Sequence, residues 1–436
     1  MTIHTVKQGE TVSSIARRYG VPLSRIVTDN FLDDPGRLSV GRDLIIRFPS
    51  VTYTVVGGDT LSSIAARYGV SINSLYRNNP VLGGSDSIVP GQVLTVIGEE
   101  PVFSDPVAFN GYVYPFVDRT VLRRTLPYLT YLSIFTYGIR DDGTLLLPQG
   151  DDEELTRIAG EYGTVPLLML TSLTDEGKFS NELVSRILNE SELADRVIEN
   201  VIENLESKSY GGVDVDFEYI GEEGKEAYNN FLRRLSEQLD GRFLLFVSVA
   251  PKISEDQPGI LYEGHDYDTI GSIADRVLVM TYEWGYTYGP PNAVSPLPEV
   301  TRVLNYAVSA IEPGKVFSGV PNYGYDWPLP FVKGMTKAKT VSNEEAVELA
   351  SDKQAEIKYD PVKAAPFFNY FDRPTSFNDA VEHVVWFENA RSCDALLRLI
   401  PQFGIAGSGV WNVMKFFPEL WLTANSLFNI EKTEQG

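Results

Sequence analysis

The sequence is poor in the residue types from which disulfide bonds and zinc sites are built. Among its 436 residues it has one cysteine, Cys393, and three histidines, His4, His265 and His383, which lie far apart. A single cysteine excludes an internal disulfide bond, and the histidine spacing does not match that of a zinc site. We therefore expect no disulfide framework, no metal and no cofactor.

Positive charge and long apolar runs are also scarce. The chain has 37 Lys and Arg residues against 59 Asp and Glu residues, so its formal net charge is −22. This excess argues against nucleic acid and against an anionic membrane surface as partners. No apolar run is long enough to span a bilayer. Residues 1–6 lack the basic start and apolar core of a signal peptide. We expect a monomer made without a signal peptide.

The first hundred residues contain an internal repeat. Residues 9–21, which read GETVSSIARRYGV, return at 58–70 as GDTLSSIAARYGV. Each copy predicts a short strand, a helix capped by Thr11 or Thr60, a second helix and a closing strand. A chain of 436 residues is long for one domain. The repeat predicts two small modules at its start, at 1–49 and 51–98.

This strand-helix-helix-strand (βααβ) unit resembles the LysM module over nearly the whole length of both copies. The resemblance implies binding of glycans that contain N-acetylglucosamine, such as peptidoglycan or chitin. We expect the groove between the first helix and the loop before it, although the two threonines are also explained as helix caps alone. The expected glycan-binding residues are Gly9, Glu10, Thr11, Val12, Phe31 and Leu32 in the first copy and Gly58, Asp59, Thr60, Leu61, Pro80 and Val81 in the second.

Beyond residue 101, apolar runs of strand type alternate with amphipathic helical segments. Strands that alternate with helices in this way predict an α/β fold, a (β/α)8 TIM barrel at 102–436. The segment from about 328 to 380 is too long for a simple loop. The expected strands are 109–114, 131–136, 165–170, 212–219, 243–250, 276–282, 316–321 and 407–412.

Three carboxylates alternate with apolar residues in the stretch 210–220, which reads YGGVDVDFEYI. Alternate side chains of a strand share a face, so Asp214, Asp216 and Glu218 line up. A strand between helices belongs to a parallel sheet, in which acids on a buried face are costly unless that face is functional. The pattern predicts catalytic carboxylates. The alternatives are an edge strand with a solvated acidic face and a divalent cation site.

The same stretch resembles the signature of glycoside hydrolase family 18, which has acids at its first, fourth, sixth and eighth positions. Asp214, Asp216 and Glu218 fill the last three, and Gly211 departs from the first. The resemblance implies that the substrate's own acetamido group is the nucleophile. Glu218 would be the acid/base, Asp216 would orient the acetamide, and Asp214 would lie behind Asp216 and share a proton with it. The family also has a small α+β insertion, which we expect at about 328–380.

The ends of other strands meet at the same mouth of such a barrel and supply further candidates. The resemblance implies that Tyr282 donates a hydrogen bond to the acetamide carbonyl and that Trp411 forms the floor under the sugar. Tyrosine and tryptophan suit sugars because their rings stack on C–H faces and their polar tips bond to hydroxyls. Glu283 stands where the family usually has aspartate. The other expected substrate contacts are Trp284, Tyr323 and Tyr112, with Trp284 equally explained by packing.

Residues 281–291, which read TYEWGYTYGPP, and the two LysM copies together resemble one branch of the family. That branch is the spore cortex-lytic N-acetylglucosaminidases of endospore-forming bacteria. The resemblance implies a retaining enzyme at the spore coat or cortex that cleaves peptidoglycan, with the LysM pair holding it on its polymer. One alternative is a non-catalytic, lectin-like coat protein, which the missing acid at position 211 favours. The other is a chitinase for chitin oligomers. Endo and exo cleavage stay open.

Overall fold

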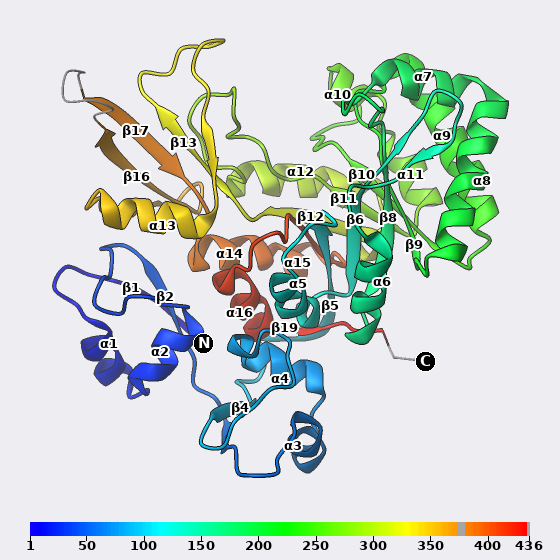
Figure 1. Cartoon of the computed structure of the whole chain (residues 1–436). Helices are drawn as coiled ribbons and strands as arrows, with labels where there is room; N and C mark the ends of the chain where they lie inside the picture. Colours follow the sequence, from blue (N-terminus) through cyan, green and yellow to red (C-terminus); the bar gives the residue numbers. More distant parts are fainter. Residues whose placement is uncertain (373–379, 434–436) are drawn as a thin grey trace.

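The computed structural model describes residues 1–372 and 380–433 of the chain. In this part, two small N-terminal modules and an antiparallel sheet pack against a closed parallel barrel (Figure 1). None of the helices described there combines the length and the hydrophobicity needed to cross a membrane. Nor do three His, Cys, Asp or Glu side chains in these residues stand where they could hold a metal ion together.

Parallel strands form the closed barrel. Each pairs with the next along the chain, and the last also pairs with the first, so the ring has no free edge. The predicted fold class is confirmed. The strands are β5 Phe103–Val113, β6 Tyr131–Ile139, β8 Val165–Thr171, β9 Gly212–Asp216, β10 Leu244–Val249, β11 Arg276–Val279, β12 Val316–Pro321 and β18 Gly407–Trp411.

Two of these strands end earlier than the sequence suggests. β9 stops at Asp216 instead of residue 219, and β11 stops at Val279 instead of residue 282. At both places the chain leaves the sheet at the carboxyl end of the strand, where barrel enzymes place their functional loops. Glu218 and Tyr282 therefore stand on the loops just beyond the strands.

Helices cover the outside of the barrel because their apolar residues recur at helical spacing. In α8, Leu193, Val197, Val201 and Leu205 are all buried. The outer helices are α5 Arg119–Thr125, α6 Asp152–Glu161, α7 Asn181–Asn189, α8 Ser191–Ser207, α9 Gly221–Leu239, α10 Ile260–Glu263, α11 Tyr267–Ile273, α12 Leu297–Ala310, α14 Ala390–Leu397, α15 Leu399–Phe403 and α16 Pro418–Leu427. The short strands β7 Leu145–Leu146 and β19 Phe428–Ile430 extend the sheet.

The acidic and the apolar side chains that alternate in the stretch 210–220 lie on opposite faces of β9. Val213, Val215 and Phe217 belong to the large core between barrel and helices. A separate apolar cluster that includes Tyr112, Phe246 and Phe317 fills the interior. Inside the barrel, Asp214 accepts hydrogen bonds from the hydroxyl groups of Ser133 on β6 and Ser248 on β10. The acids therefore face the interior and the mouth.

The insertion is an antiparallel sheet with one helix, α13 Asn343–Asp352. It extends beyond the expected range of about 328–380, because its central strands pair Tyr325 with Trp386. Residues 373–379 of that range lie outside the described part of the chain. The sheet order is β14-β13-β17-β16-β15. Its strands are β13 Gly324–Pro328, β14 Lys339–Val341, β15 Lys358–Asp360, β16 Ala365–Asp372 and β17 Val381–Trp386.

Both N-terminal modules have the expected order of strand, two helices and strand. Thr11 and Thr60 cap their first helices, and in each case the serine three residues later completes a capping box. Gly20 and Gly69 end these helices in the left-handed conformation. The elements are β1 Thr2–Thr5, α1 Val12–Tyr19, α2 Leu23–Asp29 and β2 Asp43–Ile46, then β3 Val51–Thr54, α3 Leu61–Tyr68, α4 Ile72–Asn78 and β4 Val93–Ile97.

The two copies dock differently, although their sequences are alike. In the first module, the carbonyl of Val40 accepts a hydrogen bond of 3.0 Å from the backbone N–H of Ile357 in the insertion. Its Asp43 accepts a bond of 2.9 Å from Arg391 of the barrel. The second module docks on the barrel, where Tyr128 donates to the carbonyl of Arg77 at 2.8 Å, and it also accepts a hydrogen bond of 2.7 Å at Thr95 Oγ1 from Arg25 of the first module.

A pair of equivalent glycines offers a matched test of the first docking. Gly41 and Gly91 have φ values of 85° and 89°, so alanine strains either backbone by about 1–2 kcal/mol. A Cβ at Gly41 would lie 1.8 Å from the carbonyl oxygen of Ile357, whereas a Cβ at Gly91 meets nothing within 4 Å. We expect Gly41→Ala alone to release the first module, which small-angle scattering would detect as a larger radius of gyration. Equal radii for both variants would contradict the docking.

Candidate active site

Asp214 lies at the centre of a buried hydrogen-bond network inside the barrel. Its side chain is fully buried on β9. Ser133 Oγ on β6 donates to Asp214 Oδ2 at 2.7 Å, and Ser248 Oγ on β10 approaches Oδ1 at 3.2 Å. Burial raises the pKa of the Asp214 carboxyl, and the hydroxyl donors act in the opposite direction. Strands on both sides therefore fix the position of this acid.

Asp216 and Glu218 form a coupled pair of carboxyl groups at the mouth. Burial raises the pKa of Asp216 well above its usual value, and the nearby charges of Glu218 and Asp214 raise it further. Burial also raises the pKa of Glu218. Among the described residues, Asp216 Oδ1 is buried and has no hydrogen-bond partner. Two such neighbours resist ionising together, so the pair holds a proton to higher pH than an isolated carboxyl group does.

Tyr282 follows β11 and stands close to these acids. After burial, the charges of Asp216 and Glu218 are the main causes that raise the pKa of its hydroxyl group. The hydroxyl therefore stays protonated and can donate a hydrogen bond. Tyr112 takes a different position from the one expected of a substrate contact. It is 1% exposed, and its hydroxyl lies 3.5 Å from Ser248 Oγ. Its hydroxyl also interacts with Asp214, so Tyr112 supports the buried acid.

Trp411 ends β18 in a cluster of aromatic rings. Its ring centroid lies 5.6 Å from that of Tyr112, 5.2 Å from that of Phe135 and 6.3 Å from that of Tyr114. Contacts on several sides fix the indole ring, while part of it stays accessible. A partly exposed, rigid ring of this kind offers a flat apolar surface to a sugar.

Glu283 and two tyrosines form a second polar group next to Tyr282. Tyr323 donates a short hydrogen bond to Glu283 Oε1, and Tyr325 donates to the same oxygen at 3.0 Å. Burial raises the pKa of Glu283, and both hydroxyl donors lower it. Trp284 is partly buried against the main core. The two predicted substrate contacts Glu283 and Tyr323 are therefore hydrogen-bonded to each other. Tyr325 is a further partner of Glu283 that the sequence did not suggest.

His265 is a further residue of this region to which the sequence assigned no role. It is 1% exposed, and its Nδ1 accepts a 2.9 Å hydrogen bond from the backbone N–H of Ala250. Its Nε2 therefore carries the proton and donates to the carbonyl of Phe217 at 2.9 Å. Phe217 directly precedes Glu218, so His265 holds the backbone that presents the acid. Burial lowers the pKa of His265 to about 4.

This pKa predicts a pH-dependent contribution to stability. Below its ordinary pKa of 6.5, His265 binds a proton in the unfolded chain but stays neutral in the folded one until about pH 4. Its contribution is therefore complete above pH 6.5 and falls as the pH drops, by about 2 kcal/mol at pH 5. In urea unfolding, the gap in free energy of unfolding between the parent and His265→Gln should narrow by this amount from pH 7 to pH 5. A constant gap would contradict the assignment.

Eight of the twelve residues expected to bind glycan in the modules separate into three groups, and of the other four Val12, Leu32 and Leu61 are buried and Val81 is exposed. Gly9, Gly58, Thr11 and Thr60 are exposed. Glu10 and Asp59 hold their own loops, because each accepts a backbone hydrogen bond, from Lys7 and Val56 respectively, at 2.9 Å. Phe31 and Pro80 are directed elsewhere. Phe31 packs on Phe416 of the barrel with centroids 5.5 Å apart, and Pro80 is buried.

Comparison with known proteins gives concordant results over the whole chain. The family model "Glycosyl hydrolases family 18" matches residues 140–415, and the LysM domain model matches 4–47 and 53–96. The chain is 36% identical to the cortical fragment-lytic enzyme of Bacillus anthracis, covering 99% of both chains. It is 31% identical to the putative sporulation-specific glycosylase YdhD of Bacillus subtilis (strain 168), covering 99% of this chain and 100% of the relative.

A solved structure agrees with these matches. The crystal structure of the Bacillus cereus spore cortex-lytic enzyme SleL superimposes with a TM-score of 0.82 at 36% identity, covering 99% of each chain. The resemblance to glycoside hydrolase family 18 and the resemblance to the LysM module are thus both confirmed. The chain is a glycoside hydrolase that belongs to glycosyl hydrolases family 18, and it has two LysM domains before the barrel.

Proposed function

We propose that this chain hydrolyses the β-1,4 bonds that follow N-acetylglucosamine in spore cortex peptidoglycan. The observation that supports it best is the placement of Asp214, Asp216 and Glu218 along one strand and its exit loop, beside Tyr282. Full-length relatives named as cortical fragment-lytic enzymes support the substrate and a place in the spore.

The proposed mechanism retains the configuration of the sugar through the substrate's own acetamido group. Glu218 gives its proton to the glycosidic oxygen while the acetamido oxygen attacks the anomeric carbon. Asp216 orients the acetamide and offsets the positive charge of the oxazolinium ion, and Tyr282 donates to the acetamido oxygen. Glu218, now ionised, then takes a proton from water, and that water opens the ring. The bond to the leaving sugar breaks in the first step.

The LysM domains are proposed to keep the enzyme on its polymer. Two linked modules raise the local concentration of glycan chains at the barrel without new contacts at the active site. The exposed loops at Gly9 and Gly58 are the candidate sugar-binding surfaces.

The lectin-like alternative depended on the missing first acid, and the structure gives a local reason for that absence. A Cβ at Gly211 would lie 2.2 Å from Cγ1 of Val165, so an acidic side chain there requires the Val165 side chain to move. Gly211 also precedes β9, at the end of the barrel opposite the mouth. Its identity therefore says little about the acids that face substrate, and hydrolysis is the function we favour.

Product analysis tests the proposal and separates it from both alternatives. Cortex fragments are incubated with the enzyme, and the new reducing ends are labelled by borohydride reduction before acid hydrolysis. We expect labelled glucosaminitol, because acid hydrolysis removes the acetyl group from the reduced N-acetylglucosamine, and slower turnover of chitin oligomers than of cortex fragments. No new reducing ends would favour the lectin-like protein. Faster turnover of chitin oligomers would favour the chitinase.

A further inference from the structure

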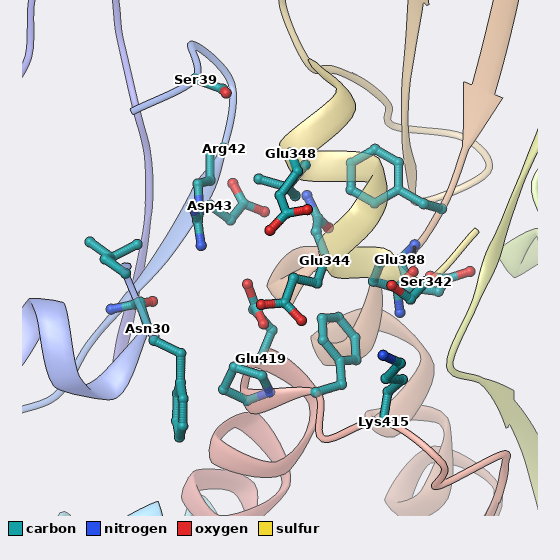
Figure 2. A pocket seen from close by; sticks show the side chains of 18 of the residues that line it. Asn30, Ser39, Arg42, Asp43, Ser342, Glu344, Glu348, Glu388, Lys415 and Glu419 are labelled. Atoms are coloured by element: carbon teal, nitrogen blue, oxygen red, sulfur yellow. Dashed lines mark hydrogen bonds between the residues drawn. The ribbon is translucent and has the colours of Figure 1, made fainter. Parts of the chain in front are cut away.

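A cavity of about 540 Å³ lies where the first LysM module, the insertion and the barrel meet (Figure 2). Its walls come from the loop after α2, the start of α13, the turn between β17 and α14, and the segment between β18 and α16. The catalytic candidates Asp214, Asp216 and Glu218 do not line it. Its volume is within the range of pockets that hold small ligands.

Buried polar atoms without partners are concentrated around this cavity. Of the 12 such side-chain atoms in the described part of the chain, 6 belong to residues that line it. Buried polar groups are normally hydrogen-bonded, so this concentration indicates that the cavity has a polar occupant. The six atoms are Ser39 Oγ, Arg42 Nε, Arg124 Nε, Glu388 Oε1, Glu388 Oε2 and Asn389 Nδ2.

Glu388 is the most informative of these residues. It is 1% exposed, and both of its carboxyl oxygens lack a partner among the described residues. The nearby hydroxyl of Ser392 is engaged, because it donates to the carbonyl of Asn389 at 2.9 Å. Burial raises the pKa of the Glu388 carboxyl to about 8. At neutral pH this group is protonated, and it can donate one hydrogen bond and accept others.

The chemistry of the walls restricts the occupant. Apart from the protonated Glu388, acidic residues that line the cavity outnumber basic ones by seven to four, which disfavours an anionic ligand. Figure 2 shows Glu344, Glu348 and Glu419 converging on one side of it, opposite Arg42. The rings of Phe31, Phe416 and Phe417 also line it. Donors, acceptors and apolar rings around one space suit a neutral sugar.

We propose that this cavity is a second saccharide site, which takes a neutral oligosaccharide of N-acetylated amino sugars and connects the first LysM module to the catalytic barrel. Phe31 and Leu32, which the LysM resemblance placed in the module's groove, line the cavity. The cavity therefore extends from these two residues of the module to residues of the barrel and the insertion. The inference goes beyond the proposed function, because it does not require Glu218 to act as the acid.

Calorimetric titration of the full chain with the soluble tetramer of N-acetylglucosamine tests the proposal. The Glu218→Gln background prevents turnover during the titration. Added to it, Glu344→Trp fills the cavity from an exposed helical position, and Glu388→Gln removes the carboxyl group. Glu237→Gln, on the exposed face of α9, is the matched control. We expect the background and the control to bind one more equivalent of tetramer than the Glu344→Trp protein.

The Glu388→Gln protein should still bind the additional equivalent of tetramer, but with about tenfold weaker affinity. A loss of this size is the effect of one altered buried hydrogen bond. A tetramer of galacturonic acid, which is anionic, should not bind there. Equal stoichiometry in the background, control and Glu344→Trp proteins would overturn the proposal, as would binding by none of them. A cleavage assay of the parent enzyme tests the proposed function separately, so the two failures can be told apart.

Discussion

Glu218→Gln should lower kcat on cortex fragments by about 10²- to 10⁴-fold, the usual contribution of a positioned general acid. Glutamine keeps the shape of the side chain but has no proton to give to the glycosidic oxygen and no carboxylate to activate water. Both chemical steps are therefore slowed, whereas the sugar contacts proposed for Trp411 and Tyr282 are left unchanged. The measurement is the rate of new reducing ends at saturating substrate, and KM should change little.

Stability measurements distinguish this loss from structural damage. Burial raises the pKa of Glu218, so the folded protein disfavours its ionised form. A neutral glutamine relieves that cost above the pKa, and the free energy of unfolding should not fall. Glu222→Gln, an exposed change four residues later on α9, is the control and should keep full activity. Undiminished cleavage by Glu218→Gln would exclude the proposed mechanism.

The fold was predictable because its signals are local. The repeat, the capping threonines and the eight apolar runs each depend on residues close together in the chain, and the structure has the barrel and both modules in the expected order. The strand ends were less predictable. β9 and β11 end early because their exit loops leave the sheet at the mouth, which apolar patterning does not reveal.

The acids of the site could also be predicted from the sequence, because all three stand in one short stretch. The residues that hold these acids in place could not. Ser133 and Ser248 flank Asp214 from other strands, and His265 reaches the carbonyl of Phe217 from a segment 48 residues away. Such partners meet only through the closure of the barrel, and a lone serine or histidine has no distinguishing pattern. The sequence assigned no role to His265, yet its burial and its two hydrogen bonds make it a positioning residue.

Phe31 shows a different limit of sequence reasoning. Within a single module its position suggests a sugar contact, and the corresponding position in the second module is Pro80. In the whole chain, Phe31 instead packs between Phe416 and Arg124, whose guanidinium carbon lies 5.1 Å from its ring centroid. Docking between domains thus moves a residue that the repeat alone would assign to the module's own groove into the wall of the cavity between the domains.

Asp216→Asn is expected to have the second largest effect, a loss of about 10²- to 10³-fold in kcat. Asparagine can still accept a hydrogen bond, but it cannot offset the positive charge that develops on the acetamide and the oxazolinium ion. Substrate in its ground state carries no such charge, so the loss should fall on kcat and leave KM nearly unchanged. A substrate whose acetamido group is replaced by a hydroxyl group should be cleaved poorly by both proteins.

The pH profile of the same variant gives a readout that a merely structural role would not produce. In the parent, the last proton leaves the Asp216–Glu218 pair against the charge of its neighbour, which raises the pKa for that step. Without a charge at position 216, only burial keeps the pKa of Glu218 raised. The alkaline limb of kcat/KM should therefore move to lower pH in Asp216→Asn. An unchanged limb, or a kcat within threefold of the parent, would show that the two carboxyl groups do not act as a coupled pair.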